Sequence, residues 1–403
     1  MLDLYDIIIV GGGAAGFFTA INAAENNPKL KILILERGKE VLGKVKVSGG
    51  GRCNVTHAEF IPADLVKKYP RGEKELRGPF HSFMTGDTIA WFEKRGIEFK
   101  TEEDGRMFPV SDSSQTIIDC FINECSRLNV EIIKGQSLKS FKKADELWKI
   151  ETNKNEFQSK KLMLATGSNS KIWSLLEKQG HSTISAVPSL FTFNIQDSRI
   201  KDLAGIATDA EVMVEGEKLE SSGPLLITHW GMSGPAILKL SAWGARELYG
   251  LDYNFNIRVN WLPGYTASDI LEDLRSLKFE NSKQQVSTRP QFELPKRLWQ
   301  SLINAAGIKP ETKWADLNKN QLTSLAEQLT AGKFQVNGKS TFKEEFVTAG
   351  GIDLKEVDFK TFESKIHKNL YFAGEILNID AITGGFNFQN AWTGGYLAAK
   401  AMS

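Results

Sequence analysis

Hydrophobic positions near the start of the chain form two short runs with a helical pattern between them. The first run is Asp6–Val10 and the second is Lys31–Leu35. Near-continuous apolar runs of this length are typical of strands buried on both faces of a parallel sheet. Between them, a glycine-rich turn leads into apolar residues at turn spacing, which predicts a helix. The order strand, turn, helix, strand predicts the first βαβ unit of a Rossmann-type fold.

The turn after the first strand fits the pattern G-x-G-x-x-G at Gly11, Gly13 and Gly16. The first glycine permits the sharp turn, the second lets backbone approach a pyrophosphate, and the third lets the helix pack on the sheet. Glu36 ends the second strand, where a carboxylate can accept hydrogen bonds from ribose hydroxyls. A glycine-rich structural turn is the alternative. The combination of strand, turn, helix and terminal acid favours dinucleotide binding.

Further along the chain, the hydrophobic pattern changes twice. Residues 1–190 keep α/β patterning, whereas short β-like runs dominate residues 191–262 and helical periodicity covers residues 266–333. The α/β pattern returns at residues 346–403. We therefore expect the first and last of these segments to form one domain, and residues 191–345 to form an insertion. We expect this insertion to cover the first domain as a lid, with a dimerisation module as the alternative.

Glycine-rich chemistry returns near the C-terminus. A strand ends in Gly374-Glu375, and Thr383–Gln389 precedes an alanine-rich helix expected at Asn390–Met402. We call Gly374–Gln389 the second grip, meaning a second region that could bind a cofactor. A single NAD does not need it, but FAD does, because its flavin and ribitol extend beyond the adenosine. The positive end of the helix dipole is expected near the flavin, where reduced flavin carries negative charge. A final core strand with a docking helix is the alternative.

Two cysteine-containing segments need separate interpretation. Lys44–Asn54 contains three consecutive glycines, so we expect a loop that wraps a ligand with backbone amides, with a flexible surface loop as the alternative. A reactive thiol at Cys53, within this loop, stays open. Cys120 and Cys125 have the spacing of flavin disulfide reductases, but on a helix their side chains point about 140° apart. We therefore expect packing cysteines.

Composition and charge narrow the function classes. A chain of 403 residues suggests more than one domain. The net charge of +1 creates no strong field for nucleic acid or acidic membranes. No apolar run is long enough to span a bilayer. The three cysteines fit a reducing compartment, and the first strand begins too early to leave room for a signal peptide, so we expect a cytoplasmic protein.

Seven motifs occur in a specific order: VGGGAAG, GKVKVSGGGRCNVTH, GRMFP, ATG, THWGMSGPAIL, VTAGGI and YFAGEILNIDAITGGFNFQNAW. With these motifs the chain resembles the bacterial FAD flavoprotein family that includes aminoacetone oxidase and a reductase of unsaturated oxo-bile-acids. The resemblance spans nearly the whole chain. It implies an α/β fold with a two-part, glutathione-reductase-like Rossmann FAD-binding domain, interrupted by a β-barrel-like and a helical subdomain.

The resemblance also implies which residues bind FAD. They lie in the first turn, the glycine loop, two strand ends and the second grip: Gly11, Gly13, Ala14, Ala15, Gly16, Glu36, Arg37, Lys44, Ser48, Gly51, Arg52, Cys53, Asn54, Ala165, Thr166, Gly167, Gly374, Glu375, Gly385, Asn387, Phe388 and Gln389. Leu138, in the strand after Gln136, is expected to hold the adenine through its backbone. The segment between Gly167 and Gly180 is shorter than in relatives, so substrate preference is expected to differ.

We therefore expect an FAD-dependent oxidoreductase with noncovalent flavin, in which hydride passes between flavin N5 and a small organic substrate. His229 and Trp230 are the candidate catalytic residues on the substrate side, although a lone histidine is more often structural. NAD(P)H as donor and oxygen as acceptor are both left open. The alternatives are an NAD-only dehydrogenase and a flavin-binding regulatory protein without turnover. No metal, nucleic-acid or membrane partner is expected, and the pattern carries no information on oligomeric state.

Overall fold

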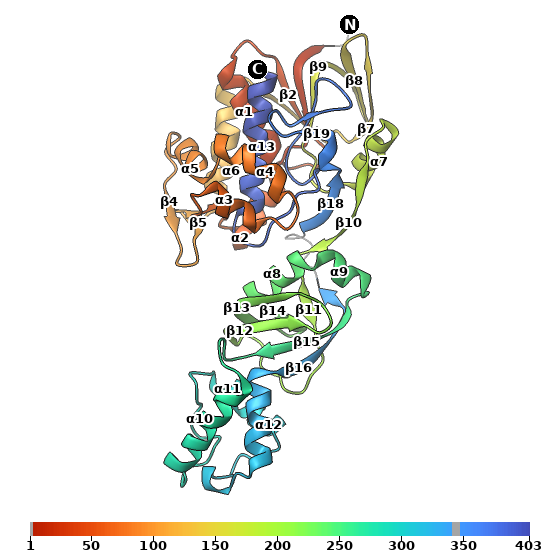
Figure 1. The fold of residues 1–403 in the computed structure, drawn as a ribbon. Coiled ribbons are helices and arrows are strands. Elements are labelled where there is room, and N and C mark those ends of the chain that lie inside the picture. The colour runs from red at the N-terminus through yellow and green to blue at the C-terminus, as the bar shows by residue number, and fades with distance from the viewer. Residues whose placement is uncertain (1–2, 341–346) are drawn as a thin grey trace. The chain divides into compact units, whose positions relative to one another are not determined.

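The computed structural model describes residues 3–340 and 347–403 of the chain. The chain divides into two compact units, which Figure 1 shows coloured along the sequence. Unit 1 contains Met1–Val187 and Lys343–Ser403, and unit 2 contains Pro188–Phe342. Unit 1 is therefore built from both ends of the chain, and unit 2 from the segment between them.

The central sheet of unit 1 runs in the order β19-β20-β21-β9-β1-β2-β6. Its parallel strands are β1 (Leu4–Val10), β2 (Ile32–Glu36), β6 (Glu131–Lys134), β9 (Glu156–Leu164) and β21 (Leu370–Phe372). Ile7, Ile8 and Ile9 are all 0% exposed, which explains why the run is apolar at every position rather than alternating. Because β21 pairs with β9, the C-terminal segment is an integral part of this sheet.

Antiparallel strands extend the central sheet, and the described part of unit 1 contains two smaller sheets. The extensions are β19 (Val357–Asp358) and β20 (Glu363–Ser364) on one edge, and β7 (Leu138–Ala144) with β8 (Leu147–Thr152), which pairs with β9. The smaller sheets contain β3 (Thr56–His57), β5 (Arg106–Pro109) and β4 (Phe99–Thr101), and β10 (Thr183–Ser189) with β18 (Val347–Ile352). The hairpin between β4 and β5 turns at Asp104-Gly105.

The first and last helices of the chain lie side by side in unit 1 (Figure 1). A Cβ on Gly395 of α13 would lie 3.1 Å from the carbonyl oxygen of Ala15 in α1, so a glycine allows the two backbones to approach closely. Phe18 and Trp392 join them further, with ring centres 5.2 Å apart. The helices of unit 1 are α1 (Ala14–Asn26), α2 (Gly43–Gly51), α3 (Pro62–Leu65), α4 (Glu73–Ser82), α5 (Thr85–Glu93), α6 (Ser114–Arg127), α7 (Ser170–Lys178) and α13 (Phe386–Met402), with the 3-10 turns η1 (Val66–Lys68) and η3 (Leu354–Glu356).

Unit 2 begins as an antiparallel sheet and continues as a group of helices. The sheet order is β16-β15-β12-β13-β14-β11-β17. The strands are β11 (Thr192–Asn194), β12 (Ala207–Val214), β13 (Glu220–Ile227), β14 (Gly231–Ser233), β15 (Asn254–Asn260), β16 (Gly332–Asn337) and β17 (Lys339–Ser340). The helices are α8 (Pro235–Trp243), α9 (Ala245–Gly250), α10 (Ala267–Glu280), α11 (Lys296–Ala305), η2 (Trp314–Asp316) and α12 (Lys319–Thr330).

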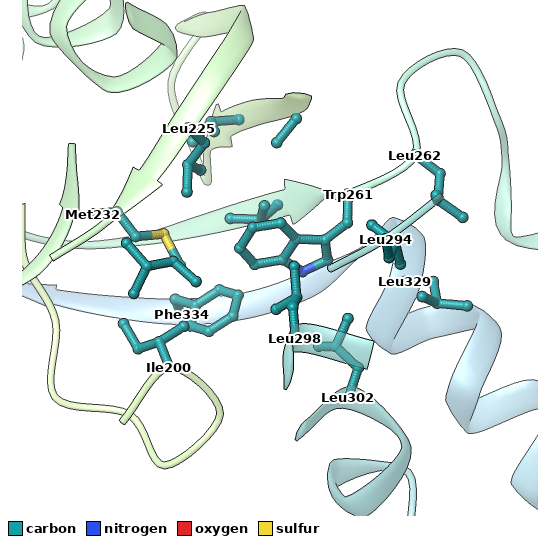
Figure 2. Packing of buried hydrophobic residues seen from close by; sticks show 14 of the residues in the cluster. Ile200, Leu225, Met232, Trp261, Leu262, Leu294, Leu298, Leu302, Leu329 and Phe334 are labelled. Atoms are coloured by element: carbon teal, nitrogen blue, oxygen red, sulfur yellow. The ribbon is translucent and has the colours of Figure 1, made fainter. Parts of the chain in front are cut away.

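One hydrophobic core joins the sheet and the helices of unit 2 (Figure 2). Trp261, just after β15, and Phe334 of β16 lie edge to face with ring centres 6.2 Å apart. Leu298 and Leu302 of α11 belong to the same cluster and are 0% exposed. Because strands and helices share these contacts, the change in periodicity near residue 266 lies within one packed unit.

Two predicted elements differ from those in the structure. The loop expected at Lys44–Asn54 begins as a helix, α2, because Val45 is buried there; its helical geometry is lost at Ser48–Gly50. The last helix starts at Phe386 rather than Asn390, since Gly385 adopts a left-handed N-cap conformation with φ 92°. This places Asn387, Phe388 and Gln389 inside its first turns. By contrast, the prediction that Leu138 lies in a strand is confirmed, because it begins β7.

Candidate functional site

The turn between β1 and α1 has no room for side chains at two of its glycines. Gly11 has φ +120°, and a Cβ there would lie 2.3 Å from the carbonyl oxygen of Ala165. A Cβ on Gly16 would lie 2.0 Å from the carbonyl oxygen of Gly11. At Gly13, by contrast, a Cβ would meet no other atom within 4 Å. No side chain caps α1 at this position, so its first N–H groups and helix dipole favour an anion.

The carboxylate of Glu36 holds the backbone on both sides of it. One oxygen accepts a hydrogen bond from the N–H of Gly12 at 2.8 Å, and the other accepts one from the N–H of Gly38 at 2.6 Å. Each carboxylate oxygen can accept a second bond, so recognition of ribose by Glu36 stays a prediction that this geometry allows. The side chain of Arg37 is exposed.

The segment between β6 and β7 lies beside Glu36. The N–H of Gln136 donates to the backbone carbonyl of Glu36 at 2.8 Å. The side-chain oxygen of Gln136 accepts a hydrogen bond from the hydroxyl of Thr152 at 2.6 Å. Leu138 lies two residues further along, opposite Thr152 of β8. The structure therefore brings Gln136 to Glu36 directly, and adenine binding by the Leu138 backbone stays a prediction.

The glycine loop presents backbone to open space. Gly49–Gly51 have φ of 58°, 69° and 85°, a left-handed conformation that favours glycine. Cβ atoms on the last two would meet no other atom within 4 Å. Arg52 contacts the β4–β5 hairpin, where its Nη1 donates to Glu102 Oε1 at 2.6 Å and its guanidinium lies 3.9 Å from the ring centre of Phe108. These contacts tie the loop to the hairpin.

Cys53 follows the loop and is fully buried. Its N–H donates to the carbonyl of Ser48 at 3.0 Å. Burial raises the pKa of the Cys53 thiol to about 12, which keeps it protonated at neutral pH and argues against a reactive thiol. Cys120 and Cys125 are both free, and burial raises their pKa to about 12 as well. They are packing cysteines of α6 rather than a redox pair.

The glycine-rich regions from opposite ends of the chain meet in unit 1. A Cβ on Gly374 would lie 3.4 Å from the Cβ of Ala15 in α1. A Cβ on Gly167, after β9, would lie 3.7 Å from Oε2 of Glu375. The same Glu375 oxygen forms an ion pair with Nζ of Lys44 at the start of α2. We call this assembly of the first turn, the end of β9, α2 and the segment after β21 the cradle.

The segment Asn54–His57 fixes the turn that precedes α13. With its amide oriented to satisfy both groups, Asn54 donates to the carbonyl of Thr56 at 3.0 Å and accepts from the N–H of Gly385 at 3.1 Å. Gly385 has φ +92°, and a Cβ there would lie 2.6 Å from the Thr56 carbonyl oxygen. Nδ1 of His57 lies 3.2 Å from the carbonyl oxygen of Gly384. The second grip is therefore shaped by residues of the N-terminal part.

The side chains at the start of α13 have their partners inside unit 1. Asn387 accepts a bond from the N–H of Ala381 at 3.0 Å and donates to its carbonyl at 3.3 Å. The ring of Phe388 stacks on Trp392 with centres 5.5 Å apart. What this helix presents at its N-terminus is chiefly backbone N–H groups and the positive end of its dipole.

The side chain of Gln389 is buried in the core and forms hydrogen bonds with three threonines. It is 0% exposed. Its Oε1 accepts bonds from Thr56 at 2.7 Å and Thr88 at 3.0 Å, and its Nε2 donates to Thr393 at 3.1 Å. Its side chain therefore links α13 to β3 and α5, and a cofactor contact by Gln389 stays a prediction.

An ion pair that sequence patterns did not reveal anchors the segment between Glu375 and Thr383. Asp380 is 0% exposed and accepts a hydrogen bond from Nε of Arg71 at 2.6 Å, with a second contact from Nη2. A buried carboxylate needs such a partner. An aspartate inside an otherwise apolar stretch was the available signal, but its partner lies far away in sequence.

His229 and Trp230 belong to unit 2, in the turn between β13 and β14. Both side chains are exposed, and Trp230 is 63% exposed. The carbonyl of Trp230 accepts a bond from the N–H of Ile195 at 2.9 Å, which anchors the turn. The cradle lies in unit 1, so a catalytic role for these two residues stays a prediction.

The cradle fits a dinucleotide that extends in two directions. Cβ atoms on Gly13, Gly50 and Gly51 would meet no other atom within 4 Å, which leaves room for a pyrophosphate to approach the backbone. Thr166, next to the first turn, has a buried Oγ1 with no hydrogen-bond partner among the described residues, which suits a bound polar group. A family model described as the HI0933-like protein Rossmann domain matches residues 5–401. The chain belongs to this HI0933-like family.

Membership of the HI0933-like family makes FAD the cofactor and the protein an FAD-dependent oxidoreductase. The chain is 28% identical over 411 residues to the ribosomal RNA dihydrouridine synthase of Escherichia coli, covering 99% of this chain and 98% of that protein. It is also 28% identical over 407 residues to the 3-dehydro-bile acid delta(4,6)-reductase of Clostridium scindens, covering 98% of each.

Two solved structures share the fold of this HI0933-like protein. The 3-ketosteroid-delta4-(5alpha)-dehydrogenase of Rhodococcus jostii has a TM-score of 0.51 and 13% identity, covering 98% of this chain and 97% of that chain. The quinol fumarate reductase FrdA of E. coli has a TM-score of 0.50 and 12% identity, covering 99% of this chain and 70% of that chain. The Rossmann FAD-binding fold expected from the sequence is thereby confirmed.

Two further properties concern the described part of the chain. No helix within residues 3–340 or 347–403 has the length and apolarity needed to cross a membrane. In the same ranges, no group of three or more His, Cys, Asp or Glu side chains is arranged to hold a metal ion.

Proposed function

We propose that this HI0933-like protein reduces a carbon–carbon double bond conjugated to a carbonyl group, in a small organic substrate, with NAD(P)H as reductant. The names of the two relatives at 28% identity support this reaction class. Dihydrouridine is uridine with one ring double bond saturated, and that bond is conjugated to a ring carbonyl. A delta(4,6)-reductase of a 3-dehydro bile acid acts on double bonds conjugated to the 3-oxo group. The substrates differ, but the bond type is shared.

The cradle is the observation that carries the proposal. It joins the first turn to the second grip, and a nucleotide alone does not need both. FAD, when bound, supplies the hydride chemistry between reductant and substrate. The turn at Gly11–Gly16 and the start of α1 would hold the pyrophosphate, and Glu36 would hold the ribose. The N-terminus of α13, at Phe386, would favour negative charge on the flavin. Overall the substrate gains a hydride and a proton, and NAD(P)H becomes NAD(P)⁺.

A small molecule suits the charge distribution better than ribosomal RNA. Enzymes that act on RNA commonly carry a basic surface to neutralise phosphates. The net charge of this chain is +1, and residues 188–342 contain as many acidic as basic side chains. We therefore propose a small conjugated carbonyl compound as substrate and make RNA an outcome of the test. We place the reaction in the cytoplasm, where three free cysteines stay reduced.

Unit 2 is proposed to provide the substrate side of the site. In the sequence it is inserted between the two parts of unit 1. His229 is the proposed proton donor to the substrate, because histidine is suited to proton transfer near neutral pH. Trp230, with its exposed ring, is proposed to contact the substrate.

The experiment is anaerobic reduction of the purified yellow protein, first with NADH and then with NADPH, followed by absorbance of the flavin. The reduced protein is then mixed with a conjugated enone, with the saturated ketone of the same skeleton, with uridine-containing RNA, or with air. We expect rapid reoxidation by the enone and none by the saturated ketone. Reoxidation by air alone would identify an oxidase, and reoxidation by RNA alone would replace the small-molecule substrate; either result overturns the proposal.

The mode of cofactor attachment is tested separately. We propose noncovalent FAD, so acid or heat should release all of the flavin, and chromatography of the released flavin should show FAD. Flavin that stays with the denatured protein, or FMN alone in the supernatant, would contradict this proposal.

A further inference from the structure

Strand β18 (Val347–Ile352) carries the VTAGGI motif and contains a buried polar side chain that the fold does not explain. All six of its residues are buried. Thr348 is 3% exposed, and its Oγ1 has no hydrogen-bond partner among the described residues. A buried hydroxyl without a partner is costly and uncommon in native proteins. Within residues 3–340 and 347–403 this hydroxyl therefore has no partner, and a bound ligand could provide one.

The backbone of β18 adjoins the segment that follows Gly374-Glu375. The N–H of Ile352 donates to the carbonyl of Ile376 at 3.1 Å, and the N–H of Asn378 donates to the carbonyl of Ile352 at 3.2 Å. Ile352 and Leu377 form a parallel bridge. The strand is thus continuous with the part of the cradle in which Glu375 pairs with Lys44.

Two glycines hold this strand rigidly between its neighbours. A Cβ on Gly350 would lie 2.6 Å from the Cα of Ala186 in β10, and a Cβ on Gly351 would lie 2.6 Å from the carbonyl oxygen of Ile376. Backbone lies on both sides at contact distance, so neither neighbour can move aside for a side chain. A rigid strand presents its side chains in a fixed position, as preorganised binding requires.

Asn378 supplies a second buried polar atom that lacks a hydrogen-bond partner within the part of the chain that the structure describes. Its Oδ1 is buried and has no hydrogen-bond partner in residues 3–340 and 347–403. It lies on the segment that β18 contacts, three residues after Glu375. Thr166, at the first turn, has a buried unpartnered Oγ1 as well. Unpartnered oxygens therefore occur after β9, on the segment after β21, and on β18, which pairs with that segment at Ile352.

We propose that Thr348 and Asn378 are additional FAD-binding residues and that β18 is a third part of the cofactor grip. FAD offers what these atoms need, since its ribityl hydroxyls and ring N–H donate and its ring carbonyls accept. A threonine hydroxyl can both donate and accept, and an asparagine oxygen accepts. The inference depends on the cofactor and not on the substrate proposed above, so an unexpected substrate leaves it intact.

Ser159 provides the matched control. Its Oγ is also buried and unpartnered, and the residue is 0% exposed. It lies in β9 opposite Tyr5, near the start of β1, whereas the cradle is formed where β1 and β9 end. The same chemical deletion can therefore be made at a buried hydroxyl remote from the cradle.

The test compares Thr348→Val, Asn378→Leu, Thr348→Ser and Ser159→Ala. For each variant, release of FAD on dilution is followed by flavin fluorescence, and thermal unfolding is recorded with and without added FAD. We expect Thr348→Val to raise the FAD dissociation constant about five-fold, as loss of one neutral hydrogen bond implies. We expect Asn378→Leu to do the same, while Thr348→Ser and Ser159→Ala bind FAD normally.

Thermal unfolding separates a cofactor contact from a packing effect. Thr348→Val removes an unpaired buried hydroxyl from the FAD-free protein, so its Tm should hold or rise, while the Tm gained on adding FAD should shrink. Unchanged FAD affinity in both Thr348→Val and Asn378→Leu overturns the proposal. So does an equal loss of affinity in Thr348→Ser, because that variant keeps the hydroxyl and the effect would then come from packing.

Discussion

Among single residues, Glu36 connects the nucleotide-binding turn to the loop after β2. Its carboxylate accepts bonds from the N–H groups of Gly12 and Gly38. If the same oxygens also accept two ribose bonds, Glu36→Ala should lower FAD affinity by roughly 2–4 kcal/mol. The two backbone donors also lose their partner, so the free energy of unfolding of the FAD-free protein should fall by about 1–3 kcal/mol. FAD titration measures the first effect and urea unfolding the second.

Glu36→Gln is the control for charge, because it keeps the shape and one acceptor oxygen. It should fall between wild type and Glu36→Ala in FAD affinity. If the FAD dissociation constant is unchanged in Glu36→Ala while stability falls, the residue serves only the backbone and the ribose assignment is wrong.

The three thiols make stability depend on pH in the alkaline range. Burial raises the pKa of Cys53, Cys120 and Cys125 to about 12. In the unfolded chain thiols ionise near pH 8.5, at about their ordinary pKa. Above that pH the unfolded state binds fewer protons than the folded state, so the free energy of unfolding falls as pH rises. We expect the fall to begin near pH 8.5 and to continue toward pH 12.

Urea unfolding at several pH values in reducing buffer measures this slope. The variant with all three cysteines replaced by alanine is the control, since it lacks the titrating thiols. Its stability should decline less steeply above about pH 8.5. Equal slopes in the two proteins would show that other groups cause the alkaline loss.

At the scale of elements, the first βαβ unit contains two glycines with different roles, one in packing and one in leaving space for the pyrophosphate. Gly16 is required by packing, because a Cβ would collide with the Gly11 carbonyl oxygen, whereas a Cβ on Gly13 meets nothing within 4 Å. Gly13→Ala should change the stability of the FAD-free protein by about 1 kcal/mol or less, as an N-cap substitution does. It should nevertheless weaken FAD binding about ten-fold or more, because the methyl group occupies space needed by the pyrophosphate.

Gly16→Ala is the matched comparison and should lose both stability and FAD. Thermal unfolding of the FAD-free proteins and FAD titration distinguish the two variants. If Gly13→Ala binds FAD as tightly as wild type, the pyrophosphate does not lie against this position, and the proposed cofactor orientation fails.

At the scale of the whole molecule, the residues proposed to bind FAD and those proposed to contact the substrate belong to different units. The cradle lies in unit 1, whereas His229 and Trp230 lie in unit 2. His229→Ala should therefore lower kcat by roughly 10²-fold or more, the usual effect of losing a general acid, while FAD content stays near normal. Trp230→Ala should impair reoxidation of the flavin by substrate. Stopped-flow absorbance measures the reoxidation and the ratio of flavin to protein gives the FAD content.

Trp243→Ala is the control, because Trp243 is another exposed tryptophan of unit 2, at the end of α8. It should keep full activity. If His229→Ala and Trp230→Ala are also fully active, the substrate side of the site lies elsewhere, although the FAD assignment stands.

The sequence alone determined the elements whose signals are local. Gly11, Gly13 and Gly16 between two apolar runs predicted the first βαβ unit, because strand burial, turn geometry and helix packing each leave a trace within a few residues. The same holds for the second glycine-rich region, since Gly374 and Gly385 adopt positive φ that few other residues tolerate. The family and the cofactor followed from these motifs.

Only the tertiary structure decided how these pieces meet. The pairs Lys44–Glu375, Arg71–Asp380 and Thr56–Gln389 each join residues that lie far apart in the chain. It also moved Gln389 into the core, tied Arg52 to the β4–β5 hairpin and left Thr348 without a partner. Hydropathy and spacing report the neighbours of a residue along the chain. Hydrogen bonds and ion pairs depend on neighbours in space, which are defined only once the two ends of the chain have packed into one sheet.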